Sequence, residues 1–257
     1  ASIHLDYIRR IADSLRLPKR LKVVVDCANA IAAGTAPTLL RALGCDVVEL
    51  YCEVDGRFPN HHPDPSIPEN LADLQAAVRE QRADIGLAFD GDADRLGVVT
   101  DAGEIVWPDR VLMPLAEEVL LQHPGAAVVY DIKCSRHLGH LIERLGGQPV
   151  LWKTGHSLIK AKMRETGALL GGEMTGHFAH ADDWFGFDDA FYAAARLLRL
   201  LARRGGSSVE FFAAFPTGIS TPELRLDMAE GEPFAFMARL TNQANFGSDA
   251  RIIALDG

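Results

Sequence analysis

Three closely spaced carboxylates are the strongest chemical signal in this sequence. Asp90, Asp92 and Asp94 alternate with small residues directly after the apolar run 85–89. Carboxylates at this spacing repel one another unless a cation neutralises them, and Gly91 is expected to let the backbone curl so that they converge. An all-oxygen ligand set is typical of Mg²⁺. We therefore predict a Mg²⁺ site in this loop, with a solvated acidic turn as the alternative.

Two other loop types fit these residues poorly. An EF-hand loop needs Gly at its sixth position and Glu at its twelfth, and those positions hold Arg95 and Asp101. A phosphatase with an aspartate nucleophile often has Asp-x-Asp followed by Thr or Val, but Asp94 stands there. A Mg²⁺-dependent phosphatase that uses Asp90 or Asp92 as nucleophile nevertheless stays open as an alternative function.

A second polar motif, Gly-Glu-Met-Thr-Gly-His, spans residues 172–177. Glu173 and Thr175 are two residues apart, so on an extended segment they would project from the same side. A carboxylate beside a hydroxyl suits two neighbouring sugar hydroxyls. His177 is then a candidate proton carrier or phosphate donor. The alternative is a glycine-rich turn with a solvated glutamate.

Two further candidates follow predicted strands and begin predicted helices. Lys133 precedes the helix predicted at 137–145, and His156, after Gly155, precedes the helix predicted at 157–165. Helix amino ends with a nearby cation favour phosphate binding. Each signal alone also fits an ordinary N-cap serine and a surface charge. Together, four loops with metal-type, cationic and sugar-type side chains follow four predicted strands, and this convergence predicts one site.

Two other polar segments are interpreted as structural. His61 and His62 lie in the proline-rich loop 55–69, and adjacent residues rarely face the same way, so we expect a rigid covering loop rather than a metal site. The acidic segment 182–189 is expected to be a capped helix start rather than a second metal site.

The elements that must position these residues alternate between strand and helix patterns. Two series resemble each other, since Val-Val-Val-Asp at 23–26 corresponds to Val-Val-Tyr-Asp at 128–131. Strands alternating with helices favour parallel sheets, whose ligand loops gather at the carboxyl ends of the strands. The predicted strands are 21–25, 46–50, 85–89, 95–100, 104–107, 126–130, 149–152 and 168–171, and the predicted helices are 3–15, 35–43, 71–81, 109–122, 137–145, 157–165 and 187–204.

We therefore predict an α/β fold with two similar three-layer α/β/α domains whose sheets are mixed but mostly parallel. Residues 1–106 form the first domain and residues 107–215 the second. Residues 216–257 are expected to open an α+β unit with strands at 221–226 and 250–255, separated by a helix near 234–243. These last residues, about forty in number, are too few for an independent core, so we expect this unit to be incomplete.

Composition excludes several classes of protein. The 257 residues carry a formal net charge of −9, which argues against a sequence-independent nucleic-acid binder. The longest stretch without a charged residue is about 14 positions, whereas a membrane helix needs about 20, so no membrane association is expected. Four cysteines without a CxxC pair predict reduced thiols and a cytoplasmic protein. The first residue is Ala, and we expect a processed or trimmed chain.

With these residues assembled, the sequence resembles the α-D-phosphohexomutase family, and within it the bacterial phosphomannomutase/phosphoglucomutase group. The resemblance covers essentially the whole chain. Members have four domains, and this chain resembles the second, the third and the opening of the fourth. Met174 is typical of the glucose/mannose group, whereas the glucosamine group tends to have Gln. The motifs that carry the resemblance are DGDADR (90–95), GEMTGH (172–177), FPNHHPDP (58–65), DIKC (131–134), TGHSLIK (154–160) and WFGFDDAFYAAARLL (184–198).

The resemblance implies a role for each matching residue. Asp90, Asp92 and Asp94 would hold Mg²⁺. Glu173 and Thr175, the latter commonly Ser in the family, would hydrogen-bond the O3 and O4 hydroxyls of the sugar. The positions implied to act on or contact the phosphorylated substrate are Arg95, Lys133, Gly155, His156 and His177.

The implied reaction interconverts hexose 1-phosphate and hexose 6-phosphate of mannose or glucose through a phosphoserine and a hexose 1,6-bisphosphate. The family's Thr-Ala-Ser-His-Asn-Pro type loop does not occur in this sequence, and neither does the phosphate-clamping loop of the fourth domain. We therefore expect the 257 residues alone to bind Mg²⁺ weakly without turnover, and the complete protein to be a monomer that binds phosphorylated hexoses. The alternative is a catalytically incomplete sugar-phosphate-binding module.

Overall fold

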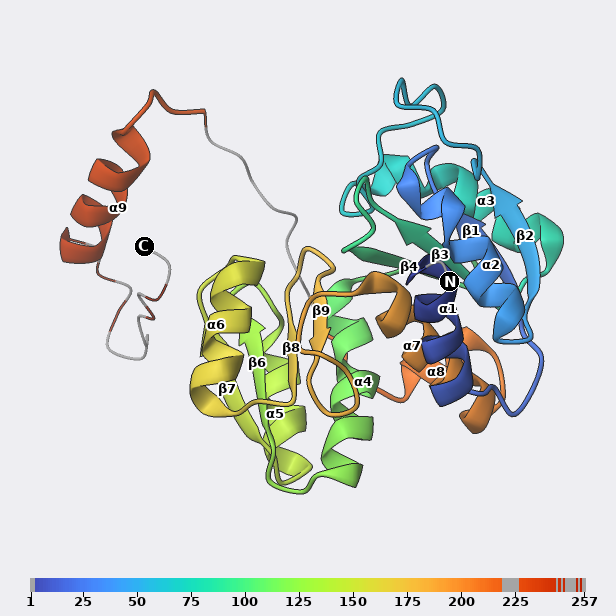
Figure 1. The fold of residues 1–257 in the computed structure, drawn as a ribbon. Coiled ribbons are helices and arrows are strands. Elements are labelled where there is room, and N and C mark those ends of the chain that lie inside the picture. Colours follow the sequence, from blue (N-terminus) through green and yellow to red (C-terminus); the bar gives the residue numbers. More distant parts are fainter. Residues whose placement is uncertain are drawn as a thin grey trace.

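The computed structural model describes residues 3–218, 227–243, 245, 247, 253 and 255. The described residues form a five-stranded sheet and a four-stranded sheet, with helices on both faces of each (Figure 1). The first sheet has the order β2 (Asp46–Leu50), β1 (Lys22–Asp26), β3 (Ile85–Phe89), β4 (Leu96–Thr100) and β5 (Ile105–Val106). The second has the order β7 (Gln148–Trp152), β6 (Ala127–Asp131), β8 (Leu170–Gly172) and β9 (Phe178–His180).

The two sheets repeat one topology. In each, the first strand in the chain pairs in parallel with the second and third strands, and the third pairs antiparallel with the fourth. This confirms the predicted fold class and accounts for the internal sequence repeat. Polar loops therefore follow the carboxyl ends of β1, β3, β6 and β8.

Alternating side chains of the central strands divide each core into two layers. Val23 and Val25 of β1 are buried in the same cluster as residues of α1 (Ile3–Ser14) and α2 (Ala36–Ala42). Val24 packs instead with Leu74 of α3 (Ala72–Gln81). In the second sheet, α6 (His156–Thr166) covers one face, and α4 (Pro108–Gln122) and α5 (Arg136–Arg144) cover the other.

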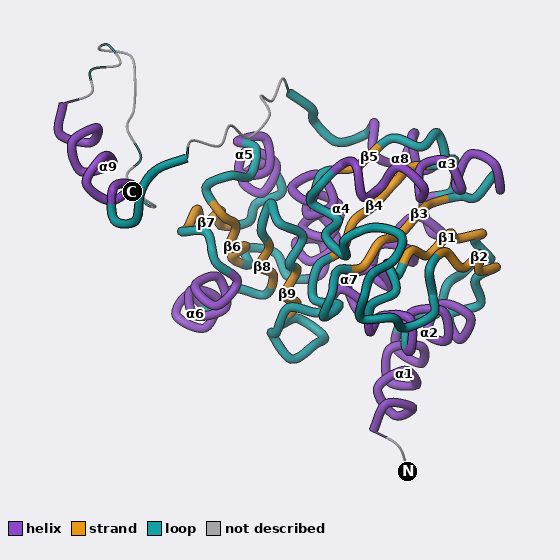
Figure 2. Tube along the Cα trace, turned by 90° about the horizontal axis from the view of Figure 1, so that it is seen from above, coloured by secondary structure: helices purple, strands orange, loops and turns teal. Residues whose placement is uncertain are grey.

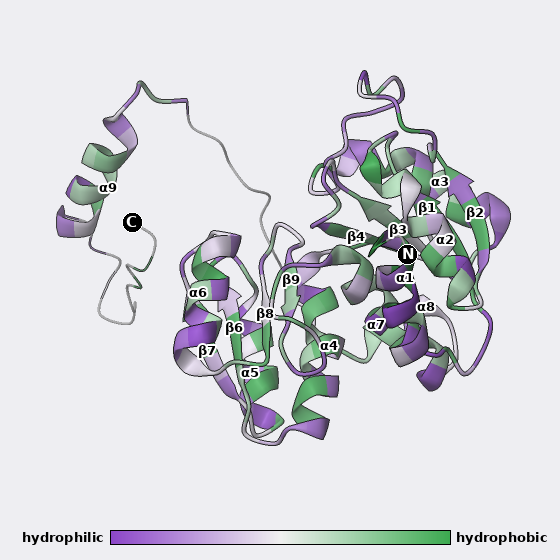
Figure 3. Cartoon of the chain, viewed as in Figure 1, coloured by the Kyte–Doolittle hydropathy of each residue, from purple (hydrophilic) through white to green (hydrophobic). Residues whose placement is uncertain are grey.

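Two helices join the sheets through a continuous apolar core. The helix α4 is buried along most of its length and is predominantly hydrophobic (Figure 3). The helix α7 (Ala190–Arg204) contacts α2 and β4 of the first sheet as well as β9 of the second. The sequence pattern predicted α7 as the closing helix of the second series, but it lies between the two sheets (Figure 2). The two domains are thus held together by shared packing.

Some elements differ from the predictions. The strand β9 was not predicted. The helix α8 (Ser208–Ala213) was also missed, although Ser207 and Glu210 form a capping box at its start, and that spacing is a recognised helix signal. The helix α9 (Glu232–Gln243) agrees with the helix expected near 234–243, whereas the strands expected at 221–226 and 250–255 lie largely outside the described residues. Over the part of the chain that the structure describes, every helix is too short or too polar to cross a bilayer.

A buried charge network lies where α4 and α7 pack together. The Arg196 side chain is 0% exposed; its Nε lies 2.6 Å from Glu118 Oε2 and its Nη1 lies 2.9 Å from Asp182 Oδ2. Arg199 Nη2 also donates to Glu118, at 2.8 Å. His180 Nδ1 is 3.6 Å from Asp182 Oδ1. Burial alone would raise the pKa of Asp182, but His180 and Arg196 hold it well below its usual range.

The buried His180 predicts an acid-sensitive stability. Burial is the main cause that lowers the pKa of His180, with a further contribution from Arg196, while Asp182 opposes the shift. Below about pH 6.5 the unfolded chain therefore binds a proton that the folded chain does not, so stability falls with falling pH, by up to about 1.4 kcal/mol per pH unit. In urea unfolding between pH 7 and 5, His180→Phe should show a shallower pH dependence than wild type. His140→Asn, at an exposed histidine, should keep the wild-type dependence; equal slopes for wild type and His180→Phe would contradict the prediction.

Candidate active site

The aspartate-rich loop after β3 and the turn between β8 and β9 meet through their main chains. Arg95 and His177 form an isolated antiparallel bridge, and Leu96 N donates to Gly176 O at 3.0 Å. Gly176 has φ +103°, and a Cβ there would lie 3.0 Å from the Leu96 carbonyl oxygen. Only glycine combines that backbone conformation with so close an approach. A single small residue thus allows the loops of the two sheets to come together.

The buried Asp90 carboxylate organises the first loop. Asp90 is 1% exposed, and its Oδ1 accepts the backbone N–H groups of Asp94 and Arg95, each at 3.0 Å. Its Oδ2 accepts from Arg95 Nε at 2.7 Å. Gly91 was expected to curl this loop, but the residue with left-handed backbone is Ala93, at φ +65°. Because both Asp90 oxygens accept hydrogen bonds, one of them from a guanidinium, the carboxylate is a weak nucleophile, which disfavours the phosphatase alternative at this residue.

The three aspartates are placed as a metal site requires. Asp90, Asp92 and Asp94 each offer a carboxylate oxygen, and these oxygens lie within 4.8 Å of one another. Asp92 is exposed, whereas Asp94 is partly buried. The donor set is all oxygen and open to solvent on one side, which suits Mg²⁺ better than the softer transition metals.

The proline-rich loop 55–69 braces this centre. His61 Nε2 lies 3.0 Å from Oδ2 of the fully buried Asp26 at the end of β1. Arg95 Nη1 donates to Asp64 Oδ1 at 3.0 Å. The loop therefore supplies Asp64, which was not predicted as a site residue. This carboxylate holds Arg95 through a second guanidinium nitrogen, in addition to the contact with Asp90.

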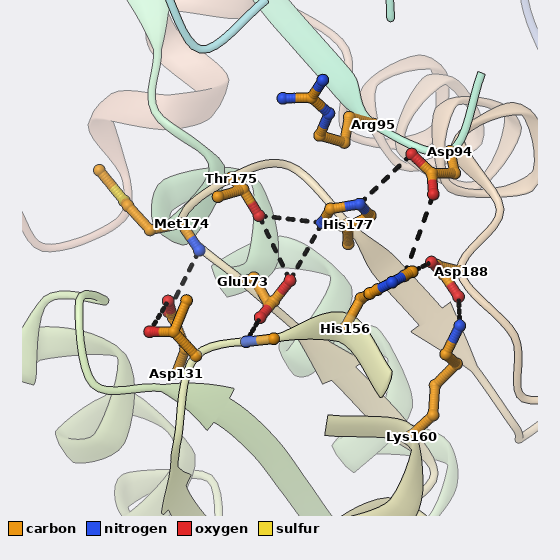
Figure 4. Close-up of polar contacts among 12 residues, drawn as sticks. Asp94, Arg95, Asp131, His156, Lys160, Glu173, Met174, Thr175, His177 and Asp188 are labelled. Carbon is orange, nitrogen blue, oxygen red and sulfur yellow. Dashed lines mark hydrogen bonds and ion pairs between the residues drawn. The ribbon is translucent and has the colours of Figure 1, made fainter. Parts of the chain in front are cut away.

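Glu173 lies at the centre of the sugar-type motif (Figure 4). It is 2% exposed and accepts hydrogen bonds from Gly155 N and, at 3.3 Å, from Thr175 Oγ1. His177 Nδ1 lies 3.0 Å from Glu173 Oε2. The segment is a turn rather than the extended stretch expected, since Gly176 N donates to Glu173 O at 3.1 Å. The turn brings the carboxylate and the hydroxyl together just as an extended segment would have.

His177 connects the two loops electrostatically. Its Nε2 lies 3.3 Å from Asp94 Oδ1, while its Nδ1 faces Glu173. Burial alone would lower the pKa of His177, but the hydrogen bonds to Asp94 and Glu173 raise it to about 9. Burial alone would likewise raise the pKa of Glu173, but His177 and Gly155 lower it. At neutral pH the site therefore contains an imidazolium between two carboxylates.

His156 brings in two residues that the sequence analysis missed. His156 Nδ1 lies 2.6 Å from Asp188 Oδ2, and Lys160 Nζ contacts the other oxygen of that carboxylate. Burial alone would raise the pKa of Asp188, but Lys160 and His156 lower it to about 2. The acidic segment 182–189 does end in a helix cap, because Asp189 Oδ1 accepts from Tyr192 N at 3.0 Å. Its neighbour Asp188 points instead into the site (Figure 4). No local sequence pattern distinguishes the role of Asp188 from that of Asp189.

Asp131 positions three of the loops. It is fully buried at the end of β6, and its Oδ1 accepts from Met174 N at 3.1 Å and from Cys134 Sγ at 2.9 Å. Its Oδ2 accepts from Thr154 Oγ1 at 3.2 Å. Burial raises the pKa of Asp131, although these donors oppose the shift. The sequence pattern could have predicted this role for Asp131. A buried strand ends in an aspartate in both halves of the repeat, at Asp26 and Asp131, which suggests that each aspartate anchors loops.

The structure separates the predicted substrate-binding residues into two groups. It brings together Gly155, His156, Glu173, Thr175 and His177, several of which line one small pocket. Lys133 is exposed and lines a different cavity of about 1070 Å³, which Met174 also borders. Lys133 therefore borders a different cavity from the one that Glu173 and His177 line.

Comparisons with known proteins identify two family domains in the chain. The family model described as phosphoglucomutase/phosphomannomutase alpha/beta/alpha domain II matches residues 4–103, and the corresponding domain III model matches residues 107–217. A phosphomannomutase/phosphoglucomutase of Pseudomonas aeruginosa is 54% identical over 251 residues, which are 98% of this chain and 54% of that protein. A phosphoglucomutase of Neisseria gonorrhoeae is 48% identical over 252 residues, covering 98% of this chain and 55% of that protein.

A solved structure shows the same fold. The crystal structure of a phosphoglucomutase/phosphomannomutase family protein from Burkholderia thailandensis has a TM-score of 0.94 and 48% sequence identity, and the match covers all of this chain and 54% of that one. This chain therefore spans about half the length of the relatives it matches. With two family domains matched in sequence and in fold, the chain belongs to the α-D-phosphohexomutase family.

Proposed function

We propose that this chain contains the metal- and sugar-binding centre of a Mg²⁺-dependent phosphohexomutase that interconverts the 1-phosphates and 6-phosphates of glucose or mannose. The observation that carries the proposal is the contact between Asp94 of the metal-type loop and His177 of the sugar-type loop, at 3.3 Å. It brings a metal-type centre and a hydroxyl-binding centre to one place. The relatives at about 50% identity are named as mutases that act on these sugars.

In this proposal Asp90, Asp92 and Asp94 hold Mg²⁺. When bound, the ion neutralises charge on a phosphoryl group during its transfer. Arg95 is held by Asp90 and Asp64 beside the same loop and adds a fixed positive charge. The family's phosphoserine loop does not occur in this sequence. The proposed phosphoryl transfer therefore requires the whole protein.

The sugar would be oriented by the second loop. Glu173 and Thr175 present an anionic acceptor and a hydroxyl to two adjacent sugar hydroxyls, and Gly155, His156 and His177 border the same place. Glucose and mannose differ only at C2, so recognition through O3 and O4 would accept both. Lys133, which lines the neighbouring cavity, would contact a phosphate group of the substrate. Between the two phosphoryl transfers, the hexose 1,6-bisphosphate would reorient in the site.

The proposed activity is tested on the whole protein that contains this chain. With glucose 1-phosphate or mannose 1-phosphate and Mg²⁺, we expect the corresponding 6-phosphate as product without release of inorganic phosphate. Phosphate release would favour the phosphatase alternative, and binding of the sugar phosphate without turnover would favour the binding-module alternative.

Asp92→Asn tests the metal assignment. Asp92 is exposed, so its substitution should leave the fold intact and lower Mg²⁺ affinity about tenfold, because one anionic oxygen ligand is lost. Isothermal titration of Mg²⁺ measures the change. Glu80→Gln, at an exposed position on α3, is the matched control and should bind Mg²⁺ as wild type does; an equal affinity in both variants would contradict the assignment.

A further inference from the structure

A second group of potential metal ligands lies beside the aspartate triad. Among the described residues, Asp94, His156, His177 and Asp188 each offer one ligand atom, and these four atoms lie within 4.8 Å of one another. We refer to these four residues as the histidine–aspartate cluster. It draws on four separate segments of the chain, and the imidazole rings of His156 and His177 are 4.8 Å apart between centroids (Figure 4).

We propose that the histidine–aspartate cluster is a binding site for a borderline transition-metal ion of the Zn²⁺ type, distinct from the Mg²⁺ site and sharing Asp94 with it. Two imidazole nitrogens and two carboxylate oxygens are a ligand set that suits Zn²⁺ or Co²⁺, whereas Mg²⁺ prefers oxygen alone. The two clusters therefore differ in the metal they select, although one residue belongs to both.

The distances in the cluster are close to those that such an ion needs. Ligand atoms about 2.0–2.2 Å from a tetrahedral Zn²⁺ lie roughly 3.3–3.6 Å from one another. His177 Nε2 and Asp94 Oδ1 are already 3.3 Å apart. His156 Nδ1 lies 4.0 Å from the other carboxylate oxygen of Asp94, Oδ2, and one ligand atom from each of the four residues lies within 4.8 Å of the others. His156 Nδ1 and Asp188 Oδ2, at 2.6 Å, must separate slightly. The His156 side chain is 46% exposed, so it is free to make this adjustment.

The contact behind His177 is an independent indication. A metal-binding histidine commonly directs its other ring nitrogen at a carboxylate, which fixes the orientation of the ring. His177 Nδ1 lies 3.0 Å from the buried Glu173 Oε2, while Nε2 faces the cluster, where the ion would replace the Nε2 proton of the imidazolium. Lys160 holds the far oxygen of Asp188 and leaves Oδ2 directed at His156. Both supporting residues thus orient ligand atoms toward one point.

A consequence follows for regulation of the enzyme. This step rests on the proposed function, in which His156 and His177 contact the sugar phosphate. An ion held by these two histidines would occupy the place of the substrate. Zn²⁺ is therefore expected to compete with the hexose phosphate for the site. Raising the Mg²⁺ concentration alone should not relieve this inhibition.

The experiment uses Co²⁺ as the only added metal and needs no catalysis. Tetrahedral Co²⁺ with nitrogen ligands absorbs strongly in the visible range, whereas octahedral Co²⁺ bound by oxygen absorbs weakly. We expect the 257-residue chain to develop the strong bands at one equivalent. His156→Asn and Asp188→Asn should each lose them, and Glu173→Gln should keep them with an affinity about 10–100-fold lower.

Two controls separate the sites. Asp92→Asn removes a ligand of the triad alone and should retain the strong bands, and His140→Asn removes an exposed histidine outside the cluster and should do the same. Circular dichroism verifies that each variant is folded. Weak bands in wild type, or strong bands that persist in both His156→Asn and Asp188→Asn, would overturn the proposal. Since no substrate is present, either result is independent of whether the protein is a mutase.

Discussion

Replacing Arg196 with Met is expected to lower the free energy of unfolding by about 3–5 kcal/mol, the range seen when one partner of a buried ion pair is removed. The Met side chain keeps much of the aliphatic volume of Arg196. It leaves Asp182 without the guanidinium contact at 2.9 Å and Glu118 without the one at 2.6 Å. Urea unfolding followed by circular dichroism measures the loss.

Arg203→Met is the matched control, because Arg203 lies on the same helix and faces the same Glu118. Its side chain is 55% exposed and its Nη1 is 3.6 Å from Glu118 Oε1. An exposed pair of this kind contributes at most about 1 kcal/mol. If the two variants lost equal stability, the buried network would not be what holds α4 and α7 together.

Replacing Glu173 with Gln is expected to lower the kcat/KM of the whole protein in the proposed mutase reaction by about 100-fold, which corresponds to about 2.7 kcal/mol of transition-state stabilisation. The carboxylate accepts from Gly155, Thr175 and His177. In Gln one of its two oxygens becomes an NH₂ donor, which must face either the Gly155 N–H or the His177 ring. A charged hydrogen bond is lost and a donor faces a donor. The variant therefore weakens the orientation of the His177 ring as well as losing the proposed anionic contact to the sugar.

Thr175→Ser tests the hydroxyl without removing it. It keeps the oxygen that lies 3.3 Å from Glu173 Oε2 and 2.9 Å from His177 Nδ1, so its kcat/KM should stay close to wild type. Steady-state assays with glucose 1-phosphate and mannose 1-phosphate compare the two variants. A Glu173→Gln protein with wild-type activity on both sugars would remove Glu173 from the proposed sugar site.

Local sequence patterns were sufficient for most of the secondary structure. The continuous apolar run 85–89 became β3 over the same residues, and Gly44 and Gly146 followed the ends of α2 and α5 closely. Strand ends were also sufficient to bring polar loops together, because parallel strands in one sheet direct their carboxyl ends to one edge. For this reason the aspartate triad and the Glu173 motif could be identified from residue types and spacing.

Side-chain partners across loops were not available from local pattern. Asp188 and Asp189 are adjacent and chemically identical, yet one contacts His156 and Lys160 while the other caps α7 and accepts from Tyr7. Asp64 and Asp131 likewise acquire their roles from residues far away in the chain. A carboxylate's partner depends on the path of the backbone in three dimensions, which neighbouring residues do not encode.

The relation between the two sheets has the same origin. Hydrophobic periodicity predicted α4 and α7 as amphipathic or buried helices, but periodicity identifies an apolar face and not the surface that covers it. Packing of α4 and α7 into one core with both sheets brings the loop of Asp94 against the turn of His177. The types and spacing of the residues thus define the chemistry of each loop, whereas long-range burial of apolar surface brings the two loops into a single site.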